Sequence, residues 1–150
     1  LNRPLMKELL SKAPGTYQHS MAVAYLAQSV GEAVGADTRL LRIGAYYHDI
    51  GKMLNPKFFV ENQFDAENPH DVLEPRESSK LILNHVRRGM KIGQEAGLPK
   101  VVVDLILQHH GTQLIEYFYN IAAKSYPNST IREEDFSYPG PKPQSVEAAL

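Results

Sequence analysis

The chain has 150 residues, an apolar share of 43% and a formal net charge of −1, which suits one globular domain with a single core. The near-zero charge gives no argument for binding duplex nucleic acid, and the lack of cysteine excludes disulfides, thiolate nucleophiles and Cys-ligated zinc. The apolar runs are short and interrupted, so no membrane span is expected within this stretch.

The apolar periodicity predicts an all-α single domain, with helices through most of residues 1–150. Prolines and Asn-Pro pairs predict one long ordered loop at residues 54–75 and a second loop at 125–144. The predicted helices number five to six, and their approximate ranges are 17–34, 38–49, 75–96, 99–110, 112–124 and 145 onward.

Capping residues set the expected boundaries of these helices. Pro14-Gly15-Thr16 is typical of a stop followed by an N-cap, and Gly35 is typical of a C-terminal stop. Asp37 or Thr38 would cap the second helix, and Ser145 the last one. Because the chain starts on Leu1 and stops within this last helix, we expect it to be a piece of a longer protein, truncated at the C-terminus.

Six histidines are distributed over this pattern in a suggestive way. The doublets His48-Asp49 and His109-His110 close the second and fourth predicted helices, and a glycine follows each. His19 lies early in the first helix and His85 midway along the third, whereas His70 lies in the loop. Adjacent residues point about 100° apart on a regular helix, but they can serve one site where the helix unwinds at its C-terminal end. That end also carries the negative pole of the helix dipole, which favours a cation.

Five histidines and one aspartate form a sulfur-free ligand set. This number of ligands is too large for one ion with an open position and fits two ions, with Asp49 as the bridge. Paired metals are a recurrent arrangement for phosphoester hydrolysis. Each doublet taken alone is as easily explained by a surface ion pair or a helix cap, and His70 alone is better explained by packing. The hypothesis depends on all these residues converging.

Several motifs in order carry a family resemblance. They are TYQHSMAVA, GAYYHDIGK, FFVENQ, NPHD, LILNHVRRG, LILQHHGT and YPGPKP. The series resembles the HD-domain metal-dependent phosphohydrolases, and in particular the HD domain of the seven-transmembrane HD proteins, the PgpH-type cyclic di-AMP phosphodiesterases. The similarity runs from about Pro14 to Leu150 and implies an HD-domain helical bundle.

The resemblance implies a ligand set and a reaction. His19 and His48 would bind one metal, His85, His109 and His110 the second, and Asp49 would bind both. The metals would be two divalent ions, iron or manganese, and the reaction would be hydrolysis of cyclic di-AMP to pApA. The family's first site also uses an aspartate that we expect beyond Leu150, and Asp135 does not match it. We therefore expect this chain to hold the first metal weakly.

Substrate contacts are predicted at three positions. Lys52, three residues after Asp49, would donate to a phosphate oxygen, and we assign it with Asp49 to catalysis. Asn62 or Gln63 would read a base edge, in a loop whose aromatics could stack on adenine. An equally good alternative is a structural loop in which Phe58, Phe59 and Phe64 fill the core and Asn68 and Asp71 make turn hydrogen bonds. The cations Arg87, Arg88 and Lys91 are better explained as a solvated helix face.

Two other functions stay open on the sequence alone. One is hydrolysis of another nucleotide by an enzyme of the same superfamily, and the other is a non-catalytic module that senses cyclic dinucleotides. The intact ligand set speaks against the sensor. The resemblance also implies a cytoplasmic domain of an integral inner-membrane protein, attached to the membrane only through segments outside this chain. The oligomeric state is left open.

Overall fold

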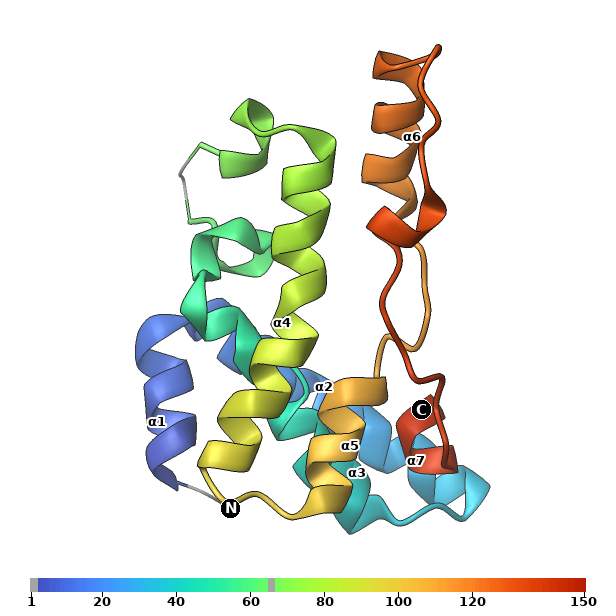
Figure 1. Ribbon diagram of the computed structural model, residues 1–150. Helices are drawn as coiled ribbons and strands as arrows, with labels where there is room; N and C mark the ends of the chain where they lie inside the picture. The colour runs from blue at the N-terminus through green and yellow to red at the C-terminus, as the bar shows by residue number, and fades with distance from the viewer. Residues whose placement is uncertain (1–2, 65–66) are drawn as a thin grey trace.

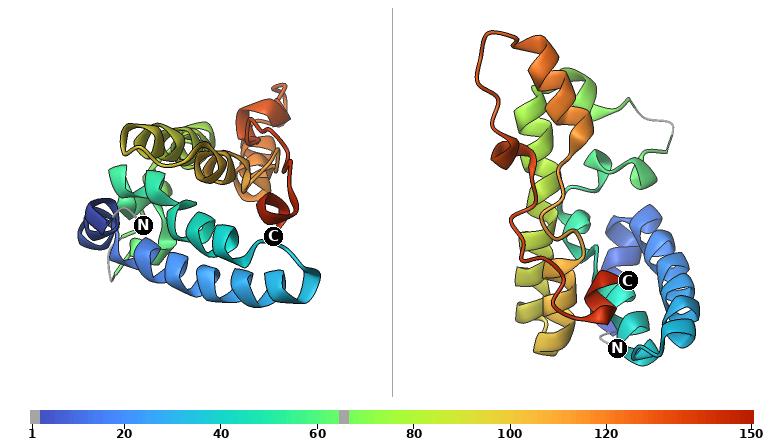
Figure 2. Two further views of the ribbon diagram at one scale, coloured as in Figure 1. Left: turned by 90° about the horizontal axis from the view of Figure 1, so that it is seen from below. Right: turned by 90° about the vertical axis from the view of Figure 1, so that its right-hand side faces the viewer.

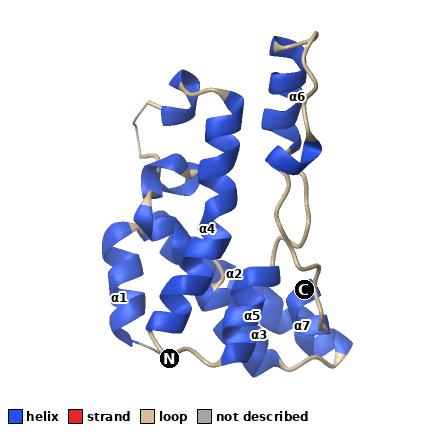
Figure 3. Ribbon diagram, in the orientation of Figure 1, coloured by secondary structure: helices blue, strands red, loops and turns tan. Residues whose placement is uncertain are grey.

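The computed structural model describes residues 3–64 and 67–150 and confirms the all-α prediction (Figure 1). Within these ranges there is no β-strand, and the one isolated β-bridge joins Leu114 to Ser137 (Figure 3). The α-helices are α1 (Arg3–Lys12), α2 (Pro14–Val34), α3 (Thr38–Tyr47), α4 (Pro75–Glu95), α5 (Lys100–Gln108), α6 (Glu116–Ser125) and α7 (Val146–Ala149).

The N-terminal helix α1 was not predicted, and it supplies an essential part of the core. Leu5, Met6 and Leu9 are buried there, next to Tyr47 and Ile106 of later helices. The predicted break at Pro14-Gly15-Thr16 is present, since α1 ends at Lys12, but the N-cap was placed wrongly because α2 begins at Pro14 itself. Proline fits the first position of a helix, where its fixed φ is suitable and its missing N–H is not needed. Thr16 is therefore buried inside the helix rather than capping it.

The helices α2 and α3 form a hairpin, and its predicted caps are confirmed. Gly35 takes a left-handed conformation with φ of 76°, and Asp37 accepts hydrogen bonds from the backbone N–H groups of Arg39 and Leu40 at 3.0 Å each. The long helix α4 packs against α5 and against the turn that follows α3, and α1 packs against α2 (Figures 1 and 2).

Short 3₁₀ helices occupy the predicted long loop between α3 and α4. They are η1 (Ile50–Leu54), η2 (Pro56–Phe58), η3 (Val60–Asn62) and η4 (Pro69–Val72). The part of the loop prediction at 65–66 lies outside the described residues.

The C-terminal third extends along the first half of α4 and then returns to α5 (Figure 2). Helix α6 begins at Glu116 rather than near residue 112, because the preceding residues are extended and pair with the returning strand-like segment. The Ile115 N–H donates to the carbonyl of Phe136, the last residue of the short helix η5 (Glu133–Phe136), at 2.8 Å. Ser145 caps α7 as predicted, accepting from the Ala148 N–H at 3.1 Å.

Among the described residues, no helix is both long and apolar enough to cross a membrane.

Candidate metal centre

Both His-containing doublets lie at helix C-terminal ends, as the sequence predicted. His48 is the C-cap of α3 and Asp49 follows it, while His109 is the C-cap of α5 and His110 follows. The turn after Asp49 packs closely on α4: a Cβ built on Gly51 would lie 1.8 Å from the His85 carbonyl oxygen. Glycine is needed at this position so that the aspartate can reach the histidine of α4.

The Asp49 carboxylate is 2% exposed and lies between two groups of imidazoles. Its Oδ2 is 3.1 Å from His48 Nε2 and 3.8 Å from His19 Nε2. Its Oδ1 is 3.2 Å from His85 Nε2 and 3.5 Å from His109 Nε2. We call His19, His48 and Asp49 the outer cluster, and Asp49, His85, His109 and His110 the inner cluster; in each, one ligand atom per residue lies within 4.8 Å of the others.

Three of the imidazoles are held in the same way by their own helices. The Nδ1 atoms of His48, His85 and His109 lie 2.7, 2.6 and 2.8 Å from the backbone carbonyl oxygen three residues earlier. A carbonyl only accepts, so each Nδ1 carries the proton and donates it. In the neutral ring, Nε2 is then left with a lone pair that points towards Asp49. This is the orientation in which metal-binding histidines are usually held.

The electrostatics around Asp49 reflect this arrangement. Burial alone would raise its pKa, but the charge on His48 when it is protonated and the close imidazoles of His109 and His85 hold the pKa well below its usual range. Burial lowers the pKa of His110 to about 3, with help from its neighbours His109 and His85. The pKa of His48 is raised, because attraction to Asp49 outweighs its burial.

The residues present fit divalent metal binding. Asp49 Oδ1 is buried and, among the described residues, receives no hydrogen bond of acceptable geometry although two Nε2 atoms are near it. The Nε2 lone pairs of the histidines and the Asp49 carboxylate face one another in a buried space. A cation bound between them would stabilise this arrangement. Nitrogen and oxygen donors without sulfur suit iron, manganese, zinc or nickel. The shared aspartate would serve both ions.

Lys52 lies in the site, as predicted. Its Nζ is 2.8 Å from Asp49 Oδ2 and 2.9 Å from Glu61 Oε1, and it is 5.0 Å from the centre of the Phe59 ring. Glu61 was not predicted as part of the site. Its motif FFVENQ was noted, but a lone glutamate among surface charges gives no signal until the loop is folded.

The loop residues proposed for base recognition make internal contacts. Asn62 accepts from the Thr16 N–H at 3.0 Å and donates to Thr16 Oγ1 at 2.8 Å, and Gln63 donates to the Lys57 carbonyl at 3.0 Å. These contacts favour the structural alternative, and base recognition by either residue stays a prediction. Phe59 is buried, whereas Phe64 is 66% exposed and does not fill the core.

His70 and the basic residues of α4 lie outside both clusters. His70 Nε2 is 2.8 Å from the Phe58 carbonyl oxygen, which agrees with a packing role. Lys91 pairs with Glu95 at 3.9 Å on the exposed surface. Arg87, in contrast, lines a cavity.

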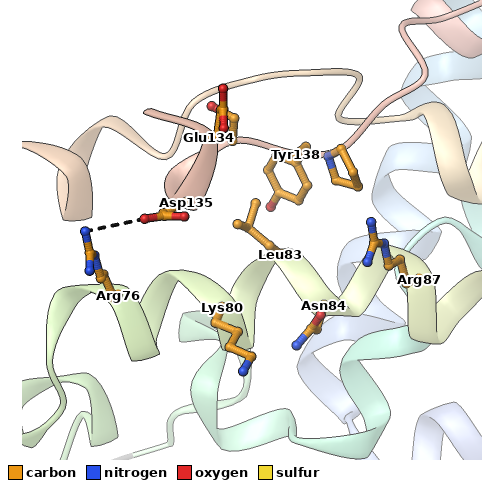
Figure 4. Close-up of a pocket in the computed structure, with 10 residues that line it drawn as sticks. Arg76, Lys80, Leu83, Asn84, Arg87, Glu134, Asp135 and Tyr138 are labelled. Carbon is orange, nitrogen blue, oxygen red and sulfur yellow. Dashed lines mark ion pairs between the residues drawn. The ribbon is translucent and has the colours of Figure 1, made fainter. Parts of the chain in front are cut away.

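This cavity of about 630 Å³ lies between α4 and residues 134–139 (Figure 4). Arg76, Lys80 and Arg87 line its α4 wall, and Asp135 on the opposite wall pairs with Arg76 at 3.4 Å. Tyr138 separates the cavity from the inner cluster, because its ring stacks on His110 with centroids 4.2 Å apart and planes at 12°. Nothing in the sequence pattern selects Tyr138 beyond its place in YPGPKP.

Residues 16–150 match the family model for the HD domain. The chain belongs to the HD-domain family. This HD domain is 49% identical over 99% of its length to the cyclic-di-AMP phosphodiesterase PgpH of Listeria monocytogenes, and 48% identical over 99% to that of Bacillus subtilis. It spans 20% and 21% of the length of these two relatives.

A solved structure gives the same fold. The crystal structure of the L. monocytogenes PgpH HD domain in complex with cyclic-di-AMP superposes with a TM-score of 0.94 at 49% identity, covering 98% of this chain and 68% of that one. The HD-domain bundle expected from the resemblance is therefore confirmed. Divalent metal binding is a property of this family, and the ligand clusters around Asp49 agree with it.

Proposed function

We propose that this HD domain is a two-metal phosphodiesterase that hydrolyses cyclic di-AMP to pApA. The observation that carries the proposal is a single buried carboxylate, Asp49, whose two oxygens face two separate groups of histidines. The high identity to cyclic-di-AMP phosphodiesterases supports the choice of substrate. The sulfur-free donor set supports iron or manganese.

The outer and inner clusters would each hold one ion, with Asp49 shared. When bound, such a pair supplies an activated water and neutralises charge on the phosphate. Asp49 lies between the two groups of histidines, one oxygen facing each group. The hydrogen bonds from Nδ1 of His48, His85 and His109 to backbone carbonyls fix the orientations of these rings. Lys52 presents a cation beside Asp49 and would donate to a non-bridging phosphate oxygen, where negative charge increases during hydrolysis.

The cavity along α4 is our candidate for the part of the dinucleotide that does not contact the metals. Its volume is in the range of small-molecule sites, and Lys80 and Arg87 offer cations for a second phosphate. Tyr138 lies at the boundary between this cavity and His110, so a substrate could extend past its ring from one to the other.

Arg87→Ala tests this placement. We expect KM for cyclic di-AMP to rise about tenfold with kcat little changed, because a charged hydrogen bond of about 1.5–3 kcal/mol is lost in both bound states. Lys91→Ala, on the same helix but paired with Glu95 at the surface, is the matched control. An unchanged KM in Arg87→Ala excludes the cavity as a substrate site.

Two alternatives remain distinct outcomes of one experiment. The chain is purified without oxygen, loaded with Mn²⁺ or Fe²⁺, and assayed with cyclic di-AMP, cyclic di-GMP and a generic phosphodiester. We expect fastest turnover of cyclic di-AMP. Preference for another phosphodiester indicates a different HD phosphohydrolase, and tight binding of cyclic di-AMP without turnover, with metals in place, indicates a sensing module.

The resemblance to seven-transmembrane proteins leads us to propose that the domain is cytoplasmic and joined to a membrane anchor in the whole protein.

A further inference from the structure

A chain of three charged groups links the loop after α3 to the metal centre. The Lys52 ammonium lies between two carboxylates, 2.8 Å from Asp49 Oδ2 and 2.9 Å from Glu61 Oε1. All three side chains are largely withdrawn from solvent, with exposed fractions of 13% for Lys52, 3% for Asp49 and 22% for Glu61. At these distances and this burial, the charges interact strongly with one another.

Glu61 is held in place from the other side by the start of α2. Thr16 Oγ1 donates to Glu61 Oε1 at 3.0 Å, and Thr16 itself is held by both ends of the Asn62 amide. The backbone of Glu61 also packs on Gly15, where a Cβ would lie 1.7 Å from the Glu61 carbonyl oxygen. Glu61 is therefore a fixed anchor, and the position of the Lys52 ammonium is set by it.

The ammonium and an outer-cluster metal need the same oxygen. Lys52 Nζ approaches Asp49 Oδ2, the oxygen that also faces His48 and His19. Two cations at one carboxylate oxygen repel each other, so a metal can bind to Oδ2 well only if the ammonium has another partner. Glu61 Oε1 is such a partner, already in hydrogen-bond contact with Lys52.

We propose that Glu61 is a positioning residue that holds the Lys52 ammonium when an outer-cluster metal takes over Asp49 Oδ2, and so keeps Lys52 facing the substrate. This inference rests on the proposed function only for the role of Lys52 towards phosphate. The effect of Glu61 on metal affinity is independent of which substrate the domain hydrolyses.

A purely structural role for Glu61, fastening the loop to α2, makes a different prediction. Glu61→Gln keeps an oxygen that can accept from Thr16 and a side chain of the same size, but it removes the charge. Glu67→Gln, at an exposed position of the same loop, is the matched control for loss of one carboxylate. A structural role predicts little change in Glu61→Gln, whereas a positioning role predicts a change that depends on Lys52.

The test is a double-mutant cycle on Mn²⁺ affinity, measured by calorimetry on the metal-free chain. If the chain binds two Mn²⁺ ions, we assign the lower-affinity step to the outer cluster. We expect Glu61→Gln to weaken this step about tenfold, because the Lys52 ammonium then pairs only with Asp49 and competes more strongly with the metal. We expect Lys52→Met to strengthen the same step about tenfold, because it removes the competing cation. In the Lys52→Met background, Glu61→Gln should have a much smaller effect, since no ammonium remains to be held. Thermal unfolding with and without Mn²⁺ shows that each variant is folded, and Lys52→Gln replaces Lys52→Met if the latter is not.

Activity gives a second readout. At saturating Mn²⁺, Glu61→Gln should lower kcat for cyclic di-AMP and leave KM nearly unchanged, while Glu67→Gln should change neither. Unchanged Mn²⁺ affinity in Glu61→Gln, or an equal effect of this substitution with and without Lys52, overturns the proposal. A wild-type chain that binds Mn²⁺ as described but does not hydrolyse cyclic di-AMP contradicts the proposed function and leaves the positioning role standing.

Discussion

The two ligand clusters share one carboxylate but differ in almost everything else. The inner cluster has four candidate ligands, and the His85 and His109 side chains are 1% and 16% exposed. The outer cluster has three candidate ligands, and the His19 side chain is 46% exposed. A lysine ammonium competes for Asp49 on the outer side, and Tyr138 covers His110 on the inner side.

This difference indicates a division of roles. More ligands in a drier setting predict tight binding of the inner metal. Fewer ligands and competition from the Lys52 ammonium predict that the outer cluster binds its metal less tightly and exchanges it faster. That metal would lie where Lys52 can contact a phosphate. The substitutions below either remove Asp49, which both clusters share, or remove one histidine from a single cluster so that the two metal affinities can be measured separately.

Asp49→Asn should have the largest effect, because it removes the charge that both clusters share. The amide keeps the shape of the carboxylate but replaces one oxygen with an NH₂ group that cannot bind a metal. We expect loss of both metal equivalents by elemental analysis and a fall of about 1,000-fold or more in hydrolysis of cyclic di-AMP.

The control for this substitution is Asp71→Asn, at an exposed position of η4 outside both clusters. It should keep full metal content and rate. Retention of one full metal equivalent by Asp49→Asn would show that the clusters do not depend on a common carboxylate.

Separate removal of one histidine from each cluster should distinguish their affinities. Stepwise titration of the wild-type chain with Mn²⁺ should give a tight and a weak step. His19→Ala should remove the weak step and leave the tight one, and His110→Ala should weaken the tight step by at least about 10–100-fold, a loss that even substitutions of supporting residues produce. If His19→Ala instead weakens the tight step, the assignment of affinities to the two clusters is reversed.

The parts of this arrangement that the sequence predicted are those with a local signal. Apolar periodicity, the caps at Gly35, Asp37 and Ser145, and the glycines after each doublet were enough to place the helix ends that carry these caps and doublets. The two doublets could then be assigned to such ends, and the grouping of both doublets with His19 and His85 around Asp49 is what the structure shows. Metal binding by each of these residues stays a prediction.

The features that the sequence missed depend on tertiary contacts. Helix α1 is short, and its apolar residues gain their role only against Tyr47 and Ile106. Glu61 joins the site because the loop folds onto Gly15 and Thr16, and Tyr138 because the chain returns from α6 to lie against His110. No periodicity or cap marks Glu61 or Tyr138, since each contact joins positions far apart in the chain.

The smallest predicted effect is the response of the metal-free chain to acid. The inner histidines His109 and His110 have lowered pKa values because of burial, that of His110 reaching about 3 against an ordinary 6.5. Between these two pH values the unfolded chain binds a proton that the folded chain does not, so folding stability decreases as pH falls below about 6.5.

His48 of the outer cluster acts in the opposite direction: its raised pKa stabilises the folded state at low pH, and that stabilisation is lost as pH rises through its folded value. Because the inner effect is the larger, urea unfolding in the presence of a chelator should show a loss of about 1 kcal/mol per pH unit between pH 6.5 and 5. His110→Phe, which can keep the stacking on Tyr138 but cannot titrate, should have a shallower dependence, and an equal slope in both proteins would assign the acid sensitivity to groups other than His110.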